Sequence, residues 1–87
     1  MKASQDTAVL FFASLREAMK TPNLNLALEN PVQVCELVQL IATQSAAYAA
    51  ALAGRELLVA VNEQLVTQQC MVTPGDTVAL FPPVTGG

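Results

Sequence analysis

The seven C-terminal residues have the residue types and the spacing that most directly indicate chemistry. They read Phe81-Pro82-Pro83-Val84-Thr85-Gly86-Gly87. Proline fixes φ and favours an extended residue before it, so the chain is expected to leave Phe81 along a stiff path. Glycine has no side chain, so a Gly86-Gly87 end can bring its carboxylate against the backbone of another protein. Fully extended, residues 82–87 would reach roughly 20 Å. We therefore expect the tail to insert into a partner's cleft.

The Gly86-Gly87 end would present its terminal carbonyl in that cleft, so these two residues are the part of the chain in which we expect function. The chain has no histidine and no evident catalytic cluster. The alternative is an idle terminus, since small residues also collect at chain ends without a function. The two prolines and the strand predicted before them favour the functional interpretation.

The composition describes one small domain with more apolar residues than its interior can hold. Of 87 residues, 53% are hydrophobic and 13% are charged, against the usual 45–50% apolar residues. Some apolar surface is therefore expected to face a partner, although an alanine-rich helix around residues 46–53 would absorb part of the excess. A net charge of −3 with four Lys and Arg argues against a nucleic-acid or anionic-membrane partner.

No segment resembles a signal peptide or approaches the roughly 18 apolar residues that cross a bilayer. The expected location is the cytoplasm. Cys35 and Cys70 form no CxxC pair, and without histidine the usual zinc sites and Cys–His nucleophile pairs are excluded. The two cysteines are predicted to be mostly buried small hydrophobes without a chemical role. No metal or cofactor is expected to bind to this chain.

The N-terminal third of the sequence predicts a strand, a short helix and a second strand. Residues 7–13 are rich in β-branched and aromatic types and predict a strand with two apolar faces. Val9 and Phe11 would lie on one face, and Leu10 and Phe12 on the other. The segment Ser14–Glu17 matches a capping box and predicts a helix to about Lys20. Alternating leucines predict a second strand over residues 24–28.

The middle of the chain predicts helix. Asn30-Pro31 offers a cap followed by proline at the first helical position. The helix is expected to begin between Pro31 and Val34 and to end near Gln44. Ser45 can restart a helix that Gly54 ends. The apolar stripe that must lie on the sheet comprises Val34, Leu37, Val38 and Ile41.

The C-terminal third predicts three strands. They cover residues 57–61, 64–66 and 77–81, with turns at Asn62-Glu63 and Pro74-Gly75. In the last strand, Val78 and Leu80 would share one face, and Ala79 and Phe81 the other. The pattern predicts an α+β fold in which a mixed sheet of about five strands has its helices on one face, with the first and last strands parallel at its centre. We expect a domain over residues 1–81 and a flexible tail over residues 82–87.

The chain resembles the molybdopterin synthase small subunit, the MoaD-type member of the ubiquitin-like sulfur carriers. The resemblance covers both ends and most of the strands. Between residues 19 and 54 it concerns helix placement more than residue identity. Thiamine-type sulfur carriers are similar in fold but usually shorter, and they lack the F-P-P-V run before Gly-Gly. The matching residues are Val9–Ala13, Leu15-Arg16-Glu17, Val61-Asn62, Gly75-Asp76 and Phe81–Gly87.

This resemblance implies a ubiquitin-like β-grasp fold and a sulfur carrier in molybdenum cofactor synthesis. A ubiquitin-activating-like adenylating enzyme would activate Gly87 with ATP, and a sulfur donor would convert the adenylate to a thiocarboxylate. The tail would then enter the large catalytic subunit of the synthase, in a heterotetramer, and deliver sulfur to a cyclic pterin precursor. This chain would be the non-catalytic subunit. The partner-binding residues implied are Phe12, Leu65, Phe81, Pro82, Pro83, Val84 and Thr85.

Several alternatives stay open from the sequence. Phe12 and Phe81 could be ordinary core aromatics instead of interface residues. The chain could carry sulfur for thiamine-thiazole or another sulfur metabolite, or it could be a ubiquitin-like modifier that forms isopeptide bonds through Gly87. It could also be a binding module whose terminus has no role.

Overall fold

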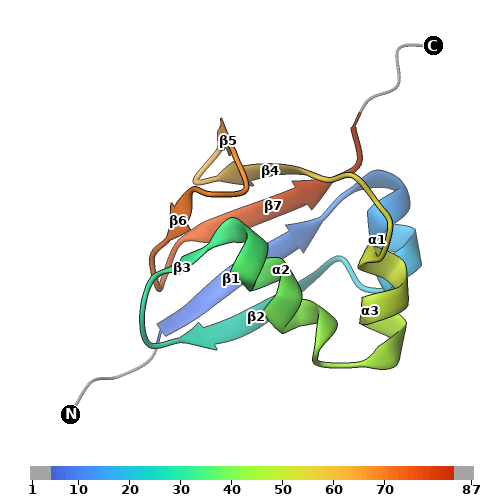
Figure 1. Cartoon of the computed structure of the whole chain (residues 1–87), viewed down its shortest axis with the longest axis horizontal. Helices are drawn as coiled ribbons and strands as arrows, with labels where there is room; N and C mark the ends of the chain where they lie inside the picture. Colours follow the sequence, from blue (N-terminus) through green and yellow to red (C-terminus); the bar gives the residue numbers. More distant parts are fainter. Residues whose placement is uncertain (1–4, 84–87) are drawn as a thin grey trace.

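A computed structural model describes residues 5–83 of the chain (Figure 1). Five strands form the main sheet and two short strands form a second one. In chain order, the helices and strands of the described residues are β1 (Gln5–Phe11), α1 (Ala13–Met19), β2 (Asn23–Leu28), β3 (Val32–Gln33), α2 (Val34–Ala42), α3 (Ala46–Leu52), β4 (Leu58–Val61), β5 (Gln64–Val66), β6 (Met71–Val72) and β7 (Thr77–Phe81).

The main sheet has the strand order β2-β1-β7-β4-β5. Strands β1 and β7 pair in parallel at its centre, with Val9 opposite Val78, and every other pair in this sheet is antiparallel. The helices lie over one face of the sheet (Figure 1). This arrangement confirms the predicted α+β fold, the mixed sheet of five strands and the parallel central pair.

The core lies between the helices and the sheet. Val9 and Phe11 of β1 are buried there, as are Val78 and Leu80 of β7. Because side chains alternate along a strand, their neighbours project to the other face. Helix α2 turns its stripe to the same core, as predicted, with Val34, Leu37 and Ile41 fully buried and Val38 packed against them.

The first helix begins without the predicted capping box. Phe12 occupies the cap position with extended backbone and no side-chain cap, and Ala13 follows with a φ of 54°. Strand β1 ends at Phe11, two residues earlier than expected, so Ser14 already lies inside the helix. The helix ends at Met19, and Lys20 after it caps the helix in a left-handed conformation and donates its N–H to the Arg16 carbonyl oxygen at 3.0 Å.

A small second sheet was not predicted. Strand β3 pairs antiparallel with β6, with Val32 opposite Val72. Helix α2 consequently begins at Val34 with Gln33 as its cap, and the prediction of a cap at Asn30-Pro31 is wrong. The Gln33 N–H donates to Glu36 Oε1 at 3.0 Å, which completes a capping box of unusual residue type.

The predicted turns and the third helix are confirmed. Asn62 and Glu63 both have positive φ, 51° and 72°, as a two-residue hairpin turn requires. Gly75 has a φ of 97° in the turn before β7. The Ser45 hydroxyl accepts the Tyr48 N–H at 3.0 Å and caps α3. Gly54, with a φ of 65°, follows the end of that helix.

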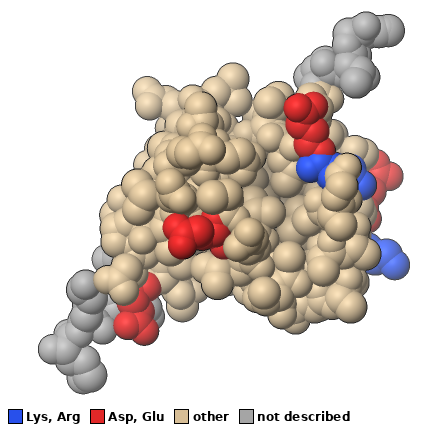
Figure 2. All heavy atoms as spheres, in the orientation of Figure 1, with Lys and Arg blue, Asp and Glu red and all other residues tan. Residues whose placement is uncertain are grey.

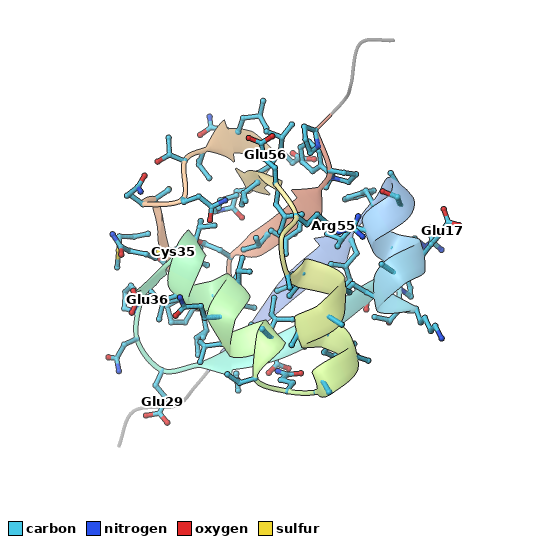
Figure 3. All side chains as sticks on the ribbon, turned by 45° about the vertical axis from the view of Figure 1, so that its right-hand side comes forward. Glu17, Glu29, Cys35, Glu36, Arg55 and Glu56 are labelled. Carbon is cyan, nitrogen blue, oxygen red and sulfur yellow. The ribbon has the colours of Figure 1, made fainter. Side chains whose placement is uncertain are left out.

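The two cysteines are free and half-buried, so they are more exposed than predicted. Figure 3 shows Cys35 at the start of α2. Cys70 packs against the core. Across residues 5–83, no helix is long and apolar enough to cross a membrane.

Candidate partner-binding face and root of the tail

The sheet has a second apolar face, on the side opposite the helices. The strand pairing places Leu10 beside Ala79, Ala79 beside Ala60 and Ala60 beside Leu65, which forms a row across β1, β7, β4 and β5. Leu65 is 70% exposed, and the other three are half-buried. We call this surface the outer sheet face, and it comprises Leu10, Phe12, Leu58, Ala60, Leu65, Ala79 and Phe81.

Two aromatic rings meet where β1 and β7 end. The rings of Phe12 and Phe81 lie edge to face, with centroids 6.5 Å apart and planes at 83°. Phe12 is 46% exposed, and Leu58, directly opposite Phe81 on β4, is 37% exposed. Edge-to-face packing fixes both rings relative to each other. These side chains form the part of the outer sheet face that lies where the chain leaves the sheet.

The fold places this aromatic pair outside the core. Phe11 is the phenylalanine of β1 that is buried, at 1% exposure. Phe12 follows it and therefore faces away, and Phe81 follows the buried Leu80 in the same way. The structure thus brings together the predicted site residues Phe12 and Phe81 on one face, with Leu65 farther along it on β5. Their role in binding a partner stays a prediction.

The tail begins at the end of a central strand. Phe81 is the last residue of β7, and Pro82 and Pro83 after it are half-buried. Strand β7 pairs with β1 on one side and with β4 on the other, so the residues from which the tail starts, which we call the tail root, are held in the middle of the sheet. The predicted site residues Val84, Thr85, Gly86 and Gly87 lie outside the described residues, so their roles stay predictions.

The charged side chains of the described residues come from several elements. On the face drawn in Figure 2, acidic groups lie at separate places on a largely uncharged surface, and basic groups lie beside some of them on the right-hand side. In Figure 3, Glu17, Glu29 and Glu36 project from separate elements and do not converge. The Arg55 Nε–H donates to the Ala51 carbonyl oxygen at 2.9 Å, which holds that side chain against α3. Within residues 5–83, no three His, Cys, Asp or Glu side chains are grouped to hold a metal ion.

The outer sheet face lies beside the root of the tail. An apolar face beside the root of a carboxylate-bearing tail can dock on a partner and direct the terminus into it. The sequence analysis had not selected Leu10, Leu58, Ala60 and Ala79 as site residues. The available signal was the apolar character of both faces of β1 and β7, because one set must lie away from the core.

Comparison with known proteins gives consistent family matches. The model of the ThiS family matches residues 9–87. The molybdopterin synthase sulfur carrier subunit of Escherichia coli is 48% identical over 79 residues, which cover 91% of this chain and 96% of the relative. Its counterpart from Haemophilus influenzae is 40% identical with the same coverage of both chains. A solved complex of subunits 1 and 2 of molybdopterin-converting factor from Helicobacter pylori matches with a TM-score of 0.62 and 23% identity, covering 95% of this chain and 100% of that one.

Proposed function

From the premise that this chain belongs to the ThiS family, we propose that it is the sulfur carrier subunit of a molybdopterin synthase. The observation that carries the proposal is the 48% identity to a subunit of that name over nearly the whole chain. The outer sheet face beside the tail root supports it, because a carrier needs a docking surface next to its cargo. The protein works in the cytoplasm and builds part of the molybdenum cofactor.

The proposed cycle uses the Gly87 carboxylate as the only reacting group of this chain. An adenylating enzyme lets the carboxylate attack the α-phosphate of ATP, which releases pyrophosphate and leaves an acyl-adenylate. A donor of sulfur at the sulfide level then displaces AMP and leaves a thiocarboxylate. In the large catalytic subunit, the sulfur passes to the cyclic pterin precursor, and water supplies the oxygen that regenerates the carboxylate. Gly86 keeps the approach to the carbonyl free of side chains.

The outer sheet face is proposed to contact the large subunit. Phe12, Phe81 and Leu65 supply the exposed apolar area at its centre and edge. Pro82, Pro83, Val84 and Thr85 then lead the terminus into the partner's cleft. The large subunit is proposed to supply the base for the transfer. A heterotetramer of two carriers and two large subunits completes the proposed assembly.

Intact-mass analysis tests this function directly. Protein produced with its activating enzyme should gain the mass of one oxygen-to-sulfur exchange, and an alkylating reagent specific for thiocarboxylates should add the mass of one further alkyl group to the loaded chain. Oxidation of a methionine adds nearly the same mass, and the chain has three methionines. A variant that lacks Gly87 is the matched control, because it retains all three and should show no gain while it still folds and binds the large subunit.

Three results would contradict the proposal. If the variant without Gly87 still gained the mass of one oxygen-to-sulfur exchange, the sulfur would be attached at another residue. Adducts that persist on reducing denaturing gels would indicate a protein modifier. Rescue of thiamine-requiring cells, without rescue of cells that lack molybdenum cofactor, would indicate a carrier for thiazole synthesis.

A further inference from the structure

We propose that the outer edge of β2 pairs with the same edge of a second copy of this chain. The two β2 strands would lie antiparallel and join both sheets into one continuous sheet. This inference uses the β2 edge alone, so it is independent of the proposed function. It begins with the position of β2, which ends the main sheet and has β1 as its single strand neighbour among residues 5–83 (Figure 1).

The backbone of β2 turns alternate residues outward. The Phe11 N–H donates to the Pro22 carbonyl oxygen at 2.9 Å, whereas the Phe12 N–H donates to Leu80 at 3.2 Å on the other side of β1. Directly opposed residues of an antiparallel pair exchange hydrogen bonds at every second position. In this register, the residues of β2 that bond to β1 are Leu24, Leu26 and Leu28. The residues whose N–H and C=O groups point away from the sheet are Asn23, Asn25 and Ala27.

A side-chain contact supports this assignment. The Thr21 hydroxyl donates to the Asn23 carbonyl oxygen at 2.9 Å, on the side away from β1. The outward groups of Asn25 and Ala27 form the middle and the far end of the edge. Backbone groups in such a position need water or another strand as their partner.

The β2 edge also lacks the features that usually prevent strand pairing. Its six residues read Asn-Leu-Asn-Leu-Ala-Leu, with no charge and no proline, and its register with β1 runs without a bulge. The opposite edge of the sheet, β5, has three residues. Very short edge strands are a common protection against association. The two edges therefore differ, and β2 is the one open to another strand.

The β2 sequence is complementary to itself about Asn25. A two-fold axis there sets Asn25 opposite its own copy and Asn23 opposite Ala27 of the second copy. Leu24, which is half-buried, then lies opposite Leu26 of the second copy on the core side of the sheet. Such an interface is isologous and closes as a dimer. It adds backbone hydrogen bonds and covers a leucine without placing like charges together.

Charged residues flank β2 beyond its two ends, with Lys20 before the strand and Glu29 after it, and both are exposed. An antiparallel arrangement of two copies turns the Lys20 end of one strand toward the Glu29 end of the other, so ends of like charge lie apart. Exposed charges of this kind contribute little free energy.

Sedimentation analysis over a range of concentrations tests the proposal. The wild-type chain should show a monomer–dimer equilibrium. Asn25→Lys sets two lysines against each other at the two-fold axis and should raise the dimer dissociation constant by about tenfold or more. Gln64→Lys makes the same charge change on the other edge strand, β5, and should leave the constant within about twofold. A wild-type chain that stays monomeric up to millimolar concentration would overturn the proposal, as would equal effects of the two variants.

A cross-linking experiment decides the case even if Asn25→Lys impairs folding. Residues opposed in a hydrogen-bonded antiparallel pair have Cα atoms about 5.5 Å apart, within the range that a disulfide bridges. In a background with Cys35→Ser and Cys70→Ser, Asn25→Cys should form a covalent dimer under mild oxidation, and Gln64→Cys should not. Equal cross-linking of both variants, or none at position 25, would show that the β2 edges do not meet.

Discussion

Phe11 and Phe12 are neighbours in sequence and occupy opposite environments. The first is 1% exposed and the second 46%. The difference follows from strand alternation, which sends Phe11 to the core and Phe12 to the outer sheet face. Phe81 joins Phe12 there through the edge-to-face contact. Phe11 and Phe12 therefore allow a core role and a binding role to be compared within one strand end.

Alanine substitutions should separate the two roles. Phe11→Ala leaves a cavity in the core and should lower the free energy of unfolding by about 3–5 kcal/mol. Phe12→Ala and Phe81→Ala remove partly exposed rings and should each lower it by about 1 kcal/mol or less, while they weaken binding to the large subunit. Urea denaturation and titration calorimetry measure the two quantities. A loss of stability for Phe81→Ala equal to that for Phe11→Ala would place its ring in the core.

At the scale of elements, two helices offer a serine near their beginning, and one of these serines caps. The Ser45 hydroxyl accepts the Tyr48 N–H at 3.0 Å, whereas α1 has no side-chain cap although Ser14 and Glu17 match the sequence pattern. The reason is the short passage from β1 into α1. Phe12 already occupies the cap position, so Ser14 lies too late to cap.

Serine-to-alanine substitutions test this difference. Ser45→Ala should lower the free energy of unfolding by about 1 kcal/mol, because a backbone N–H at the helix start loses its acceptor. Ser14→Ala should change it by less than about 0.5 kcal/mol. Urea denaturation of both variants measures the effects. Ser45→Asp, whose carboxylate can also cap the helix, should keep the free energy of unfolding close to the wild-type value. Equal losses for the two alanine variants would contradict the assigned caps.

Local patterns predicted most of the fold, because they depend on neighbouring residues. Alternation and turn residues located the five main strands, and the stripe from Val34 to Ile41 oriented α2. The pairing of β3 with β6 escaped prediction, because two residues per strand give no periodic signal and their partners lie far apart in sequence. Gln33 was missed as a cap for a related reason. Glutamine is not a usual capping residue, and its amide also reaches the Gln69 carbonyl oxygen at 3.4 Å across that small sheet.

The candidate site was predicted in part. The positions of Phe12 and Phe81 on one face followed from alternation alone. The row from Leu10 to Leu65 could not be predicted in the same way, because it depends on the register among four strands. Sequence patterns give the face on which a residue lies, and the pairing of distant strands decides which residues meet there.

At the scale of the whole molecule, many of the apolar residues that the core does not bury lie in two places. One is the outer sheet face, from Leu10 and Ala79 across to Leu65. The other is helix α3, on which Ala46, Ala47 and Ala50 are exposed. The exposed alanines agree with the alanine-rich helix considered for the composition, and the binding of a partner to the outer sheet face stays a prediction. The outer sheet face is the part with large exposed side chains close to the tail root.

Binding of the large subunit should stabilise the carrier through the outer sheet face. A partner present at 100 times its dissociation constant adds about 2.7 kcal/mol to the free energy of unfolding, which a thermal melt detects as a higher Tm. Leu65→Glu should abolish most of this increase. Leu40→Glu is the matched control, because Leu40 is an exposed leucine, at 42%, on helix α2. A loss of the increase for Leu40→Glu, or its persistence for Leu65→Glu, would move the interface to the helical side.

The parallel pairing of β1 and β7 has a mechanical consequence. A pull between the start of β1 and the end of β7 shears these two central strands along their length. Their cross-strand hydrogen bonds then resist together, whereas an antiparallel hairpin pulled at its ends opens one bond at a time. A pull applied between these two ends is therefore expected to meet more resistance than opening the antiparallel β4–β5 hairpin from its ends.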